Sequence, residues 1–94
     1  MKIIVQNQAK IPNKYIRLIK WKLYRMNKKF SHLLYAEVNI KAEGNAPITY
    51  QSNIRLGIRG YDLILKNSDN DLNTLFYKSF KGIHRYLSIA KREA

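Results

Sequence analysis

The chain has 94 residues, 46% of them apolar, and carries 18 lysines and arginines against 6 acidic residues, a net charge of +12 at pH 7. This composition supports one small core and excludes a chain that is disordered throughout. The absence of cysteine excludes disulfides and thiolate chemistry. No apolar run approaches the length of a membrane-spanning helix, and the first ten residues are too short for the apolar region of a signal peptide, so we expect a cytoplasmic protein.

The first third of the chain predicts a short strand and a long helix. Residues 2–7 form the strand, and Pro12 suits the first turn of the helix, because its missing N–H has no intrahelical partner there. The helix runs to about Phe30. Spacing at 100° per residue places these apolar residues on one side of it: Ile11, Tyr15, Leu18, Ile19, Leu23, Met26 and Phe30.

Three strands follow, with apolar residues at every second position. The first begins near His32 and has an inner face of Leu34, Ala36, Val38, Ile40 and Ala42. Residues 43–47 have the composition of a turn. The next strand has an inner face of Ile48, Tyr50, Ser52, Ile54, Leu56 and Ile58, and Gly60 then turns the chain into a last strand, residues 61–66.

A second helix is expected from about Asp71 to Arg92. Ser68 or Asp69 is the expected N-cap, and Asp71 lies where it can meet the helix dipole. The buried side of this helix is predicted to consist of Leu72, Phe76, Phe80, Ile83, Leu87 and Ala90, with Leu75 and Tyr86 at its flank.

The order β-α-β-β-β-α predicts one α+β domain over residues 1–94. The three later strands should form an antiparallel meander, and the first strand should pair in parallel with the second through a right-handed crossover. Both helices can then cover one face of a four-stranded mixed sheet, which gives a two-layer sandwich.

Basic residues gather on the helix sides that face away from the expected core. The outer side of the first helix is predicted to hold an exposed tryptophan among cations: Lys14, Arg17, Trp21, Arg25 and Lys28. Lys22 lies at the boundary between this side and the core. The outer side of the second helix holds Lys78, Lys81, Arg85 and Arg92, with Tyr77, His84 and Lys91 toward one shoulder.

Such a surface fits a nucleic acid, whose phosphates attract cations and whose unpaired bases stack on aromatic or guanidinium planes. An anionic membrane, an acidic protein or no partner at all are the alternatives, although a membrane helix would need a free apolar side. His32 and His84 are far apart in sequence and lack metal-ligand companions, and no Gly-rich phosphate loop occurs. We therefore predict no enzyme activity, cofactor, metal or small-molecule substrate.

Several spacings resemble those of the ribosome hibernation promoting factors, also called ribosome-associated inhibitors or sigma-54 modulation proteins. In the first helix the resemblance lies in Lys22-Leu23, Met26, Lys28 and Phe30, and Gly60 stands where that family turns into its fourth strand. In the last helix it lies in Asp71-Leu72, Phe76, Phe80, Ile83, Arg85, Leu87 and Lys91. The chain departs from the family pattern at Gln6, Asn73, Gly82 and Ile89.

The resemblance implies a translation inhibitor of a stress response that occupies the mRNA and tRNA channel of the small ribosomal subunit and contacts 16S rRNA. It implies the short form of the family, without a dimerisation domain, and so a monomer off the ribosome. The leading rRNA contacts would be Lys22, Arg25, Lys28, Arg85 and Lys91, supported by Lys14, Arg17, Lys78, Lys81 and Arg92. Stacking of a base on Trp21 is a separate hypothesis, and a double-stranded RNA reader or a regulator that docks on an acidic protein are the alternative functions.

Overall fold

The structure, a computed structural model, describes residues 1–30 and 33–93, apart from the side chains of residue 61 and residues 90–93. The expected start of the second strand at His32 lies outside the described residues. The order of elements is confirmed: β1 (Lys2–Asn7), α1 (Asn13–Lys29), β2 (Leu33–Glu43), β3 (Thr49–Ile58), β4 (Tyr61–Asp69) and α2 (Leu72–Glu93).

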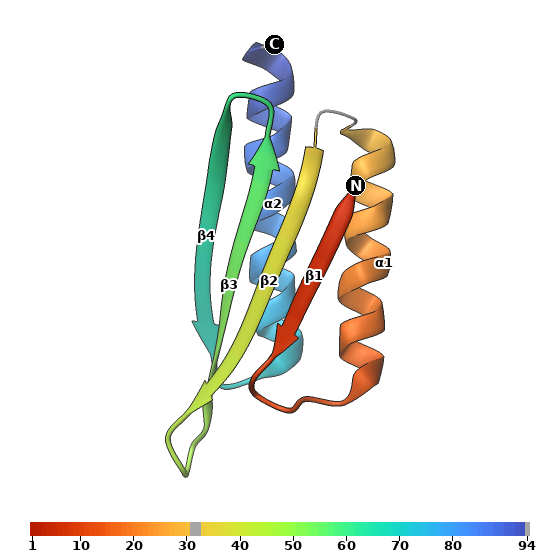
Figure 1. The fold of residues 1–94 in the computed structure, drawn as a ribbon. Coiled ribbons are helices and arrows are strands. Elements are labelled where there is room, and N and C mark those ends of the chain that lie inside the picture. Colours follow the sequence, from red (N-terminus) through yellow and green to blue (C-terminus); the bar gives the residue numbers. More distant parts are fainter. Residues whose placement is uncertain (31–32, 94) are drawn as a thin grey trace.

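The sheet has four strands in the order β1-β2-β3-β4. β1 pairs in parallel with β2, and the other two pairings are antiparallel, as predicted. Both helices cover the same face of this sheet, with α1 along β1 and α2 behind β3 and β4 (Figure 1). The predicted α+β sandwich of two layers is therefore confirmed.

The core fills the space between the two layers. Over the middle of β2 and β3 every second residue points into it, including Val38, Ile40, Ile54 and Leu56. The helices contribute the residues that recur at helical spacing: Ile19 and Leu23 from α1, and Leu75, Phe76, Phe80, Ile83 and Leu87 from α2.

Four apolar residues expected in the core lie at the surface instead: Leu18, Leu34, Ala42 and Ile48. Ala42 and Ile48 belong to the run of exposed residues 41–48 around the β2–β3 turn. Leu34 is 54% exposed, and Leu33 is buried in its place. The register of the β2–β3 pairing shifts between Leu33 and Tyr35, and a bulge of this kind moves the alternation by one residue. Leu18 is 37% exposed, because at 100° per residue it lies about 120° around the helix from the buried Phe30.

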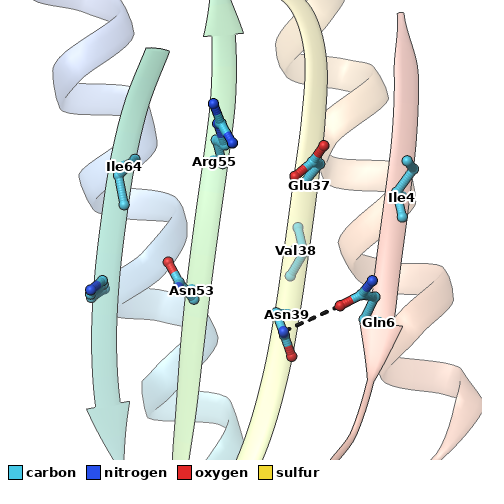
Figure 2. A pocket seen from close by; sticks show the side chains of 9 residues that line it. Ile4, Gln6, Glu37, Val38, Asn39, Asn53, Arg55 and Ile64 are labelled. Carbon is cyan, nitrogen blue, oxygen red and sulfur yellow. Dashed lines mark hydrogen bonds between the residues drawn. The ribbon is translucent and has the colours of Figure 1, made fainter.

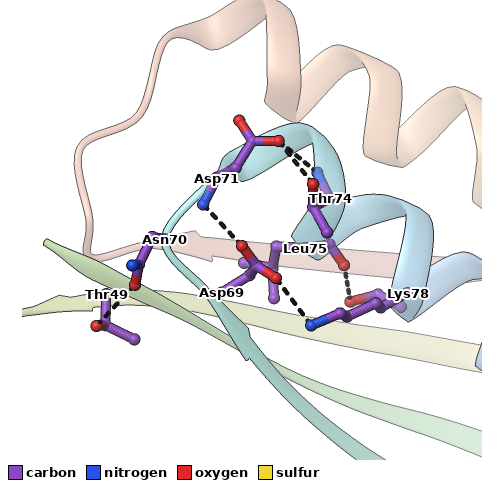
Figure 3. Close-up of polar contacts among 8 residues, drawn as sticks. Thr49, Asp69, Asn70, Asp71, Thr74, Leu75 and Lys78 are labelled. Carbon is purple, nitrogen blue, oxygen red and sulfur yellow. Dashed lines mark hydrogen bonds and ion pairs between the residues drawn. The ribbon is translucent and has the colours of Figure 1, made fainter. Parts of the chain in front are cut away.

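The second helix begins at Leu72, within one residue of the predicted start at Asp71, but the predicted end of β4 and the predicted N-cap are wrong. β4 continues to Asp69, since β3 offers it pairing partners as far as Tyr50. Asp71 supplies the cap: its carboxylate accepts the Thr74 backbone N–H at 3.0 Å and the Thr74 hydroxyl at 2.7 Å (Figure 3). Neither Ser68 nor Asp69 is the N-cap. Asp69 instead accepts the backbone N–H of Asp71 at 3.0 Å, which stabilises the turn into α2.

Neither helix, over the part of the chain that the structure describes, is long and apolar enough to cross a bilayer.

Candidate nucleic-acid interface

The solvent side of α1 carries cations around one large aromatic side chain. Lys14, Arg17, Arg25 and Lys28 are all exposed, and Trp21 is 54% exposed, so the prediction that Trp21 lies outside the core is confirmed. This side lies opposite the buried Ile19 and Leu23, which pack toward the sheet. No acidic residue occurs anywhere in the 17 residues of the helix.

Trp21 lies at the edge of an open hollow on this surface. The guanidinium carbon of Arg25 lies 4.8 Å from the centroid of the indole ring, the geometry of a cation–π contact. Residues four, seven and eight positions after Trp21 point to the same side of a helix. These residues are Arg25, Lys28 and Lys29, and with Trp21 they line a hollow of about 610 Å³.

Side chains from both helices meet along the seam between them. Lys22 is half-buried, and its ammonium group lies 5.2 Å from the centroid of the Phe80 ring, so its stem follows the edge of the core as expected. Nearer the end of α1, Lys29 Nζ donates to Nε2 of His84 at 3.1 Å. His84 also packs edge-on against Phe30, with ring centroids 5.6 Å apart. These contacts join the outer sides of α1 and α2 into one surface, which we call the helix surface.

α2 contributes a second set of cations to the helix surface. Lys78, Lys81 and Arg85 are exposed, as predicted. Lys81 Nζ lies 5.7 Å from the centroid of the exposed Tyr77 ring. The other two predicted residues of this helix, Lys91 and Arg92, have side chains outside the described part of the structure.

Lys78 differs from the other predicted contacts because it has an acidic partner. Its ammonium group lies 2.8 Å from Oδ2 of Asp69, at the junction of β4 and α2 (Figure 3). This hydrogen bond from Lys78 and the backbone N–H of Asp71 lower the pKa of the Asp69 carboxyl. The charge of Lys78 is therefore partly neutralised by Asp69 within the folded protein.

Sequence reasoning missed Lys29 and Lys20. Both are exposed, and Lys29 lines the Trp21 hollow and contacts His84. On a helical wheel Lys29 falls between the basic and the apolar sides, near Lys22, so its assignment depends on where α2 lies. Its spacing of eight residues from Trp21, about two turns, was the available signal.

The opposite face of the sheet has a different electrostatic character. Arg55 donates to Asp62 Oδ2 from Nε at 3.0 Å and from Nη2 at 2.6 Å, and the Tyr35 hydroxyl donates to Asp62 Oδ1 at 2.8 Å. The hydrogen bonds from Arg55, and to a smaller extent the one from Tyr35, lower the pKa of the Asp62 carboxyl. The hydrogen bond to Asp62 in turn raises the pKa of the Tyr35 hydroxyl. The Tyr35 ring lies over Gly57, where a β-carbon would overlap it.

Amide side chains line a hollow of about 420 Å³ on the same face. Asn39 Nδ2 donates to Oε1 of Gln6 at 3.2 Å, and Asn53 lies nearby on β3 (Figure 2). Glu37 and Arg55 border the hollow with opposite charges. This face is mixed in sign, whereas the helix surface is cationic.

The ion pairs also distinguish the outer sheet face from the cationic side of α1. Among the residues whose side chains the structure describes, the ion pairs are Arg55–Asp62 and Lys78–Asp69, so no described carboxylate neutralises a cation of α1. In the same described residues, no group of three or more metal-ligating side chains could hold a metal ion. The arrangement can bind polyanions through charge and planar groups.

Solved structures share this class of fold, a four-stranded mixed sheet backed on one face by two helices. A ribosomal subunit interface protein from Coxiella burnetii matches with a TM-score of 0.81 over 98% of this chain and 99% of that chain, at 14% sequence identity. The N-terminal domain of Protein Y from Thermus thermophilus matches with a TM-score of 0.70 over 99% of this chain and 96% of that chain, at 19% identity.

At these identities the likeness establishes the fold, and it confirms the fold that the family resemblance implies. No family model matches the sequence, and no curated protein matches it.

Proposed function

We propose that this protein is a ribosome-binding translation inhibitor, a hibernation factor that occupies the mRNA and tRNA channel of the small subunit. Its fold is that of a protein named for the ribosomal subunit interface, along nearly the whole length of both chains. The resemblance of its helix spacings to the hibernation factors points the same way. The mechanism is steric occlusion, with no bond made or broken.

The observation that carries the proposal is the unneutralised charge of α1. In the described part of the chain its lysines and arginines have no acidic partner, although each would gain from one. rRNA provides phosphates for these cations, and each neutralised phosphate releases counterions into solution. The exposed contacts on α1 would be Lys14, Arg17, Arg25 and Lys28, with Lys22 reaching out from the seam.

α2 completes the proposed contact surface. Lys81 and Arg85 are exposed on α2 and supply cations at a second position across the helix surface. Lys78 contributes less, because Asp69 competes with phosphate for it. Lys91 and Arg92 continue the helix toward its end and are assigned as contacts from the sequence pattern. The mixed charges of the outer sheet face favour a position away from the rRNA backbone.

Co-sedimentation with purified small ribosomal subunits tests this function. The protein should pellet with the subunits at a saturable ratio, and an excess of mRNA with initiator tRNA should displace it if it occupies their channel. Free duplex RNA and an acidic polypeptide serve as parallel ligands. Equally tight binding to duplex RNA would identify a double-stranded RNA reader, and preferential binding to the polypeptide would identify a regulator of an acidic protein.

A further inference from the structure

Trp21 is the single tryptophan of the chain, and the core does not use it. It lies at the centre of the cationic side of α1, with Arg25 over its ring and two lysines beside it. Exposed tryptophan is uncommon on surfaces that only need to be soluble, since its large apolar area remains in contact with water. Its position among cations suggests a ligand that is both planar and anionic.

We propose that the hollow formed by Trp21, Arg25, Lys28 and Lys29 binds an unpaired nucleotide of single-stranded RNA, a specific contact that rests on the function proposed above. The base stacks on the indole and guanidinium planes, and the flanking phosphates bind the two lysines. Base stacking on aromatic side chains and on arginine is the common means by which proteins hold single-stranded RNA.

Contacts within the protein already hold the side chains of the hollow in place before a ligand binds. The contact of Arg25 with the ring, at 4.8 Å, restricts both planar groups before a base arrives. Lys29 is held from the second helix, because an ammonium group can only donate and His84 Nε2 accepts from it at 3.1 Å. Two further ammonium protons of Lys29 remain for phosphate oxygens.

The base must be unpaired for this contact. In an RNA duplex both faces of each base are covered by its neighbours, so a side chain can stack only on a base in a loop, a bulge or a single strand. Duplex RNA could still bind the lysines and arginines through its phosphates, but it would leave the indole ring in water.

An anionic membrane is the competing ligand class. Leu18 and Tyr24 are exposed one turn away from Trp21 and could insert with it into a bilayer. Against this, the main apolar side of α1 is buried in the core, and an interfacial helix needs that side free. Exposed cations also lie on both sides of Trp21 along the helix, at Arg17 and Lys28.

The fluorescence of the single tryptophan tests the proposal directly. Titration of the full chain with a short single-stranded oligoadenylate should quench Trp21, whereas an abasic oligomer of equal charge and a duplex of equal length should quench it much less. Binding of a dye-labelled oligoadenylate, a readout that does not need the tryptophan, should weaken roughly 5- to 150-fold in Trp21→Ala, and Trp21→Phe should retain part of the affinity because a ring remains.

Ile64→Ala is the matched control. Ile64 is 58% exposed, similar to Trp21, and it lies on the opposite face of the sheet (Figure 2). This variant also loses a large exposed apolar side chain, and it should bind oligoadenylate like the wild type. Urea unfolding of all three variants establishes that each is folded at the temperature of the titration.

Three outcomes would overturn the proposal: equal affinity of Trp21→Ala and wild type, equal quenching by the abasic oligomer, or a blue shift on vesicles of phosphatidylglycerol and phosphatidylcholine without quenching by RNA. Co-sedimentation separates this failure from that of the proposed function. If the wild type and Trp21→Ala pellet equally with small subunits, only the nucleotide site is lost. If the wild type does not pellet, the ribosomal function fails, and the oligoadenylate titration still decides the site.

Discussion

The hydroxyl oxygens of Ser52 on β3 and Ser79 on α2 lie 2.7 Å apart inside the core, where the two residues are 2% and 1% exposed. Ser79 also donates to the backbone carbonyl of Leu75 at 2.8 Å. Because a hydroxyl has one proton, Ser79 must accept from Ser52. This hydrogen bond connects the sheet to α2 inside the core, where both side chains are shielded from water.

The directed hydrogen bond predicts unequal effects of two similar substitutions. Ser79→Ala leaves the buried Ser52 hydroxyl without an acceptor and should lower the free energy of unfolding by about 1–3 kcal/mol. Ser52→Ala should cost less, because Ser79 keeps its bond to Leu75. The double variant should be less destabilised than the sum of the two. Urea denaturation measures all three, and equal, additive effects would contradict the assigned direction.

Two carboxylates should make the fold less stable in acid. Arg55 and then Tyr35 lower the pKa of Asp62, and Lys78 with the backbone N–H of Asp71 lowers the pKa of Asp69. A carboxyl whose pKa is lower in the folded state stabilises the fold above its unfolded pKa, and that stabilisation is lost as the pH falls through the folded value. The loss should therefore begin below about pH 4, where an unfolded aspartate takes up its proton.

Urea midpoints measured from pH 7 down to pH 2 test this expectation. The combined variant Asp62→Asn with Asp69→Asn should be less stable at neutral pH and lose less stability on acidification than the wild type. Glu43→Gln, at the exposed end of β2 and outside the ion pairs of the described residues, is the control. An unchanged acid response in the combined variant would remove these two groups as its source.

Arg85→Glu should separate binding from folding. Arg85 is exposed on α2, so the substitution should change the free energy of unfolding by only about 0.5 kcal/mol, the usual range for surface positions. Binding to small subunits should fall, since a contact is lost and a negative charge then faces phosphate. Arg59→Glu makes the same change in net charge at the exposed turn between β3 and β4, outside both helices.

The comparison of these two variants in co-sedimentation isolates the effect of position from that of net charge. Arg59→Glu should retain most of the binding. If both variants lose affinity to the same degree, the interaction depends on overall charge, and the helix surface is not a defined contact.

Binding to the small subunit should depend steeply on salt. If about six phosphates are contacted, the affinity should drop by roughly three orders of magnitude between 50 and 200 mM salt, by the relation known for duplex nucleic acids. Co-sedimentation or fluorescence anisotropy across this range gives the slope. A flat response would show that counterion release does not drive the association, and the argument from the charge of α1 would then fail.

The sequence alone determined the order of elements, most of the buried residues of both helices and the exposure of Trp21, although Leu18 was wrongly placed in the core and the side chain of Ala90 lies outside the described residues. Each of these depends on a local period, 3.6 residues for a helix and 2 for a strand, which neighbouring residues encode without knowledge of the rest of the chain. The cationic side of α1 could be predicted for the same reason. Because the helix contains no acidic residue, its outer side is positively charged whatever the rest of the fold is.

Tertiary structure alone decided the features that depend on residues distant in sequence. The bulge at Leu33 exposes Leu34 because register is set by the facing strand, and pairing with β3 carries β4 through polar residues to Asp69, which moves the cap to Asp71. It also decided which cations remain available for a ligand. Asp69 reaches Lys78 across nine residues, and His84 reaches Lys29 across 55, because packing brings those segments together, and no local pattern records such a meeting.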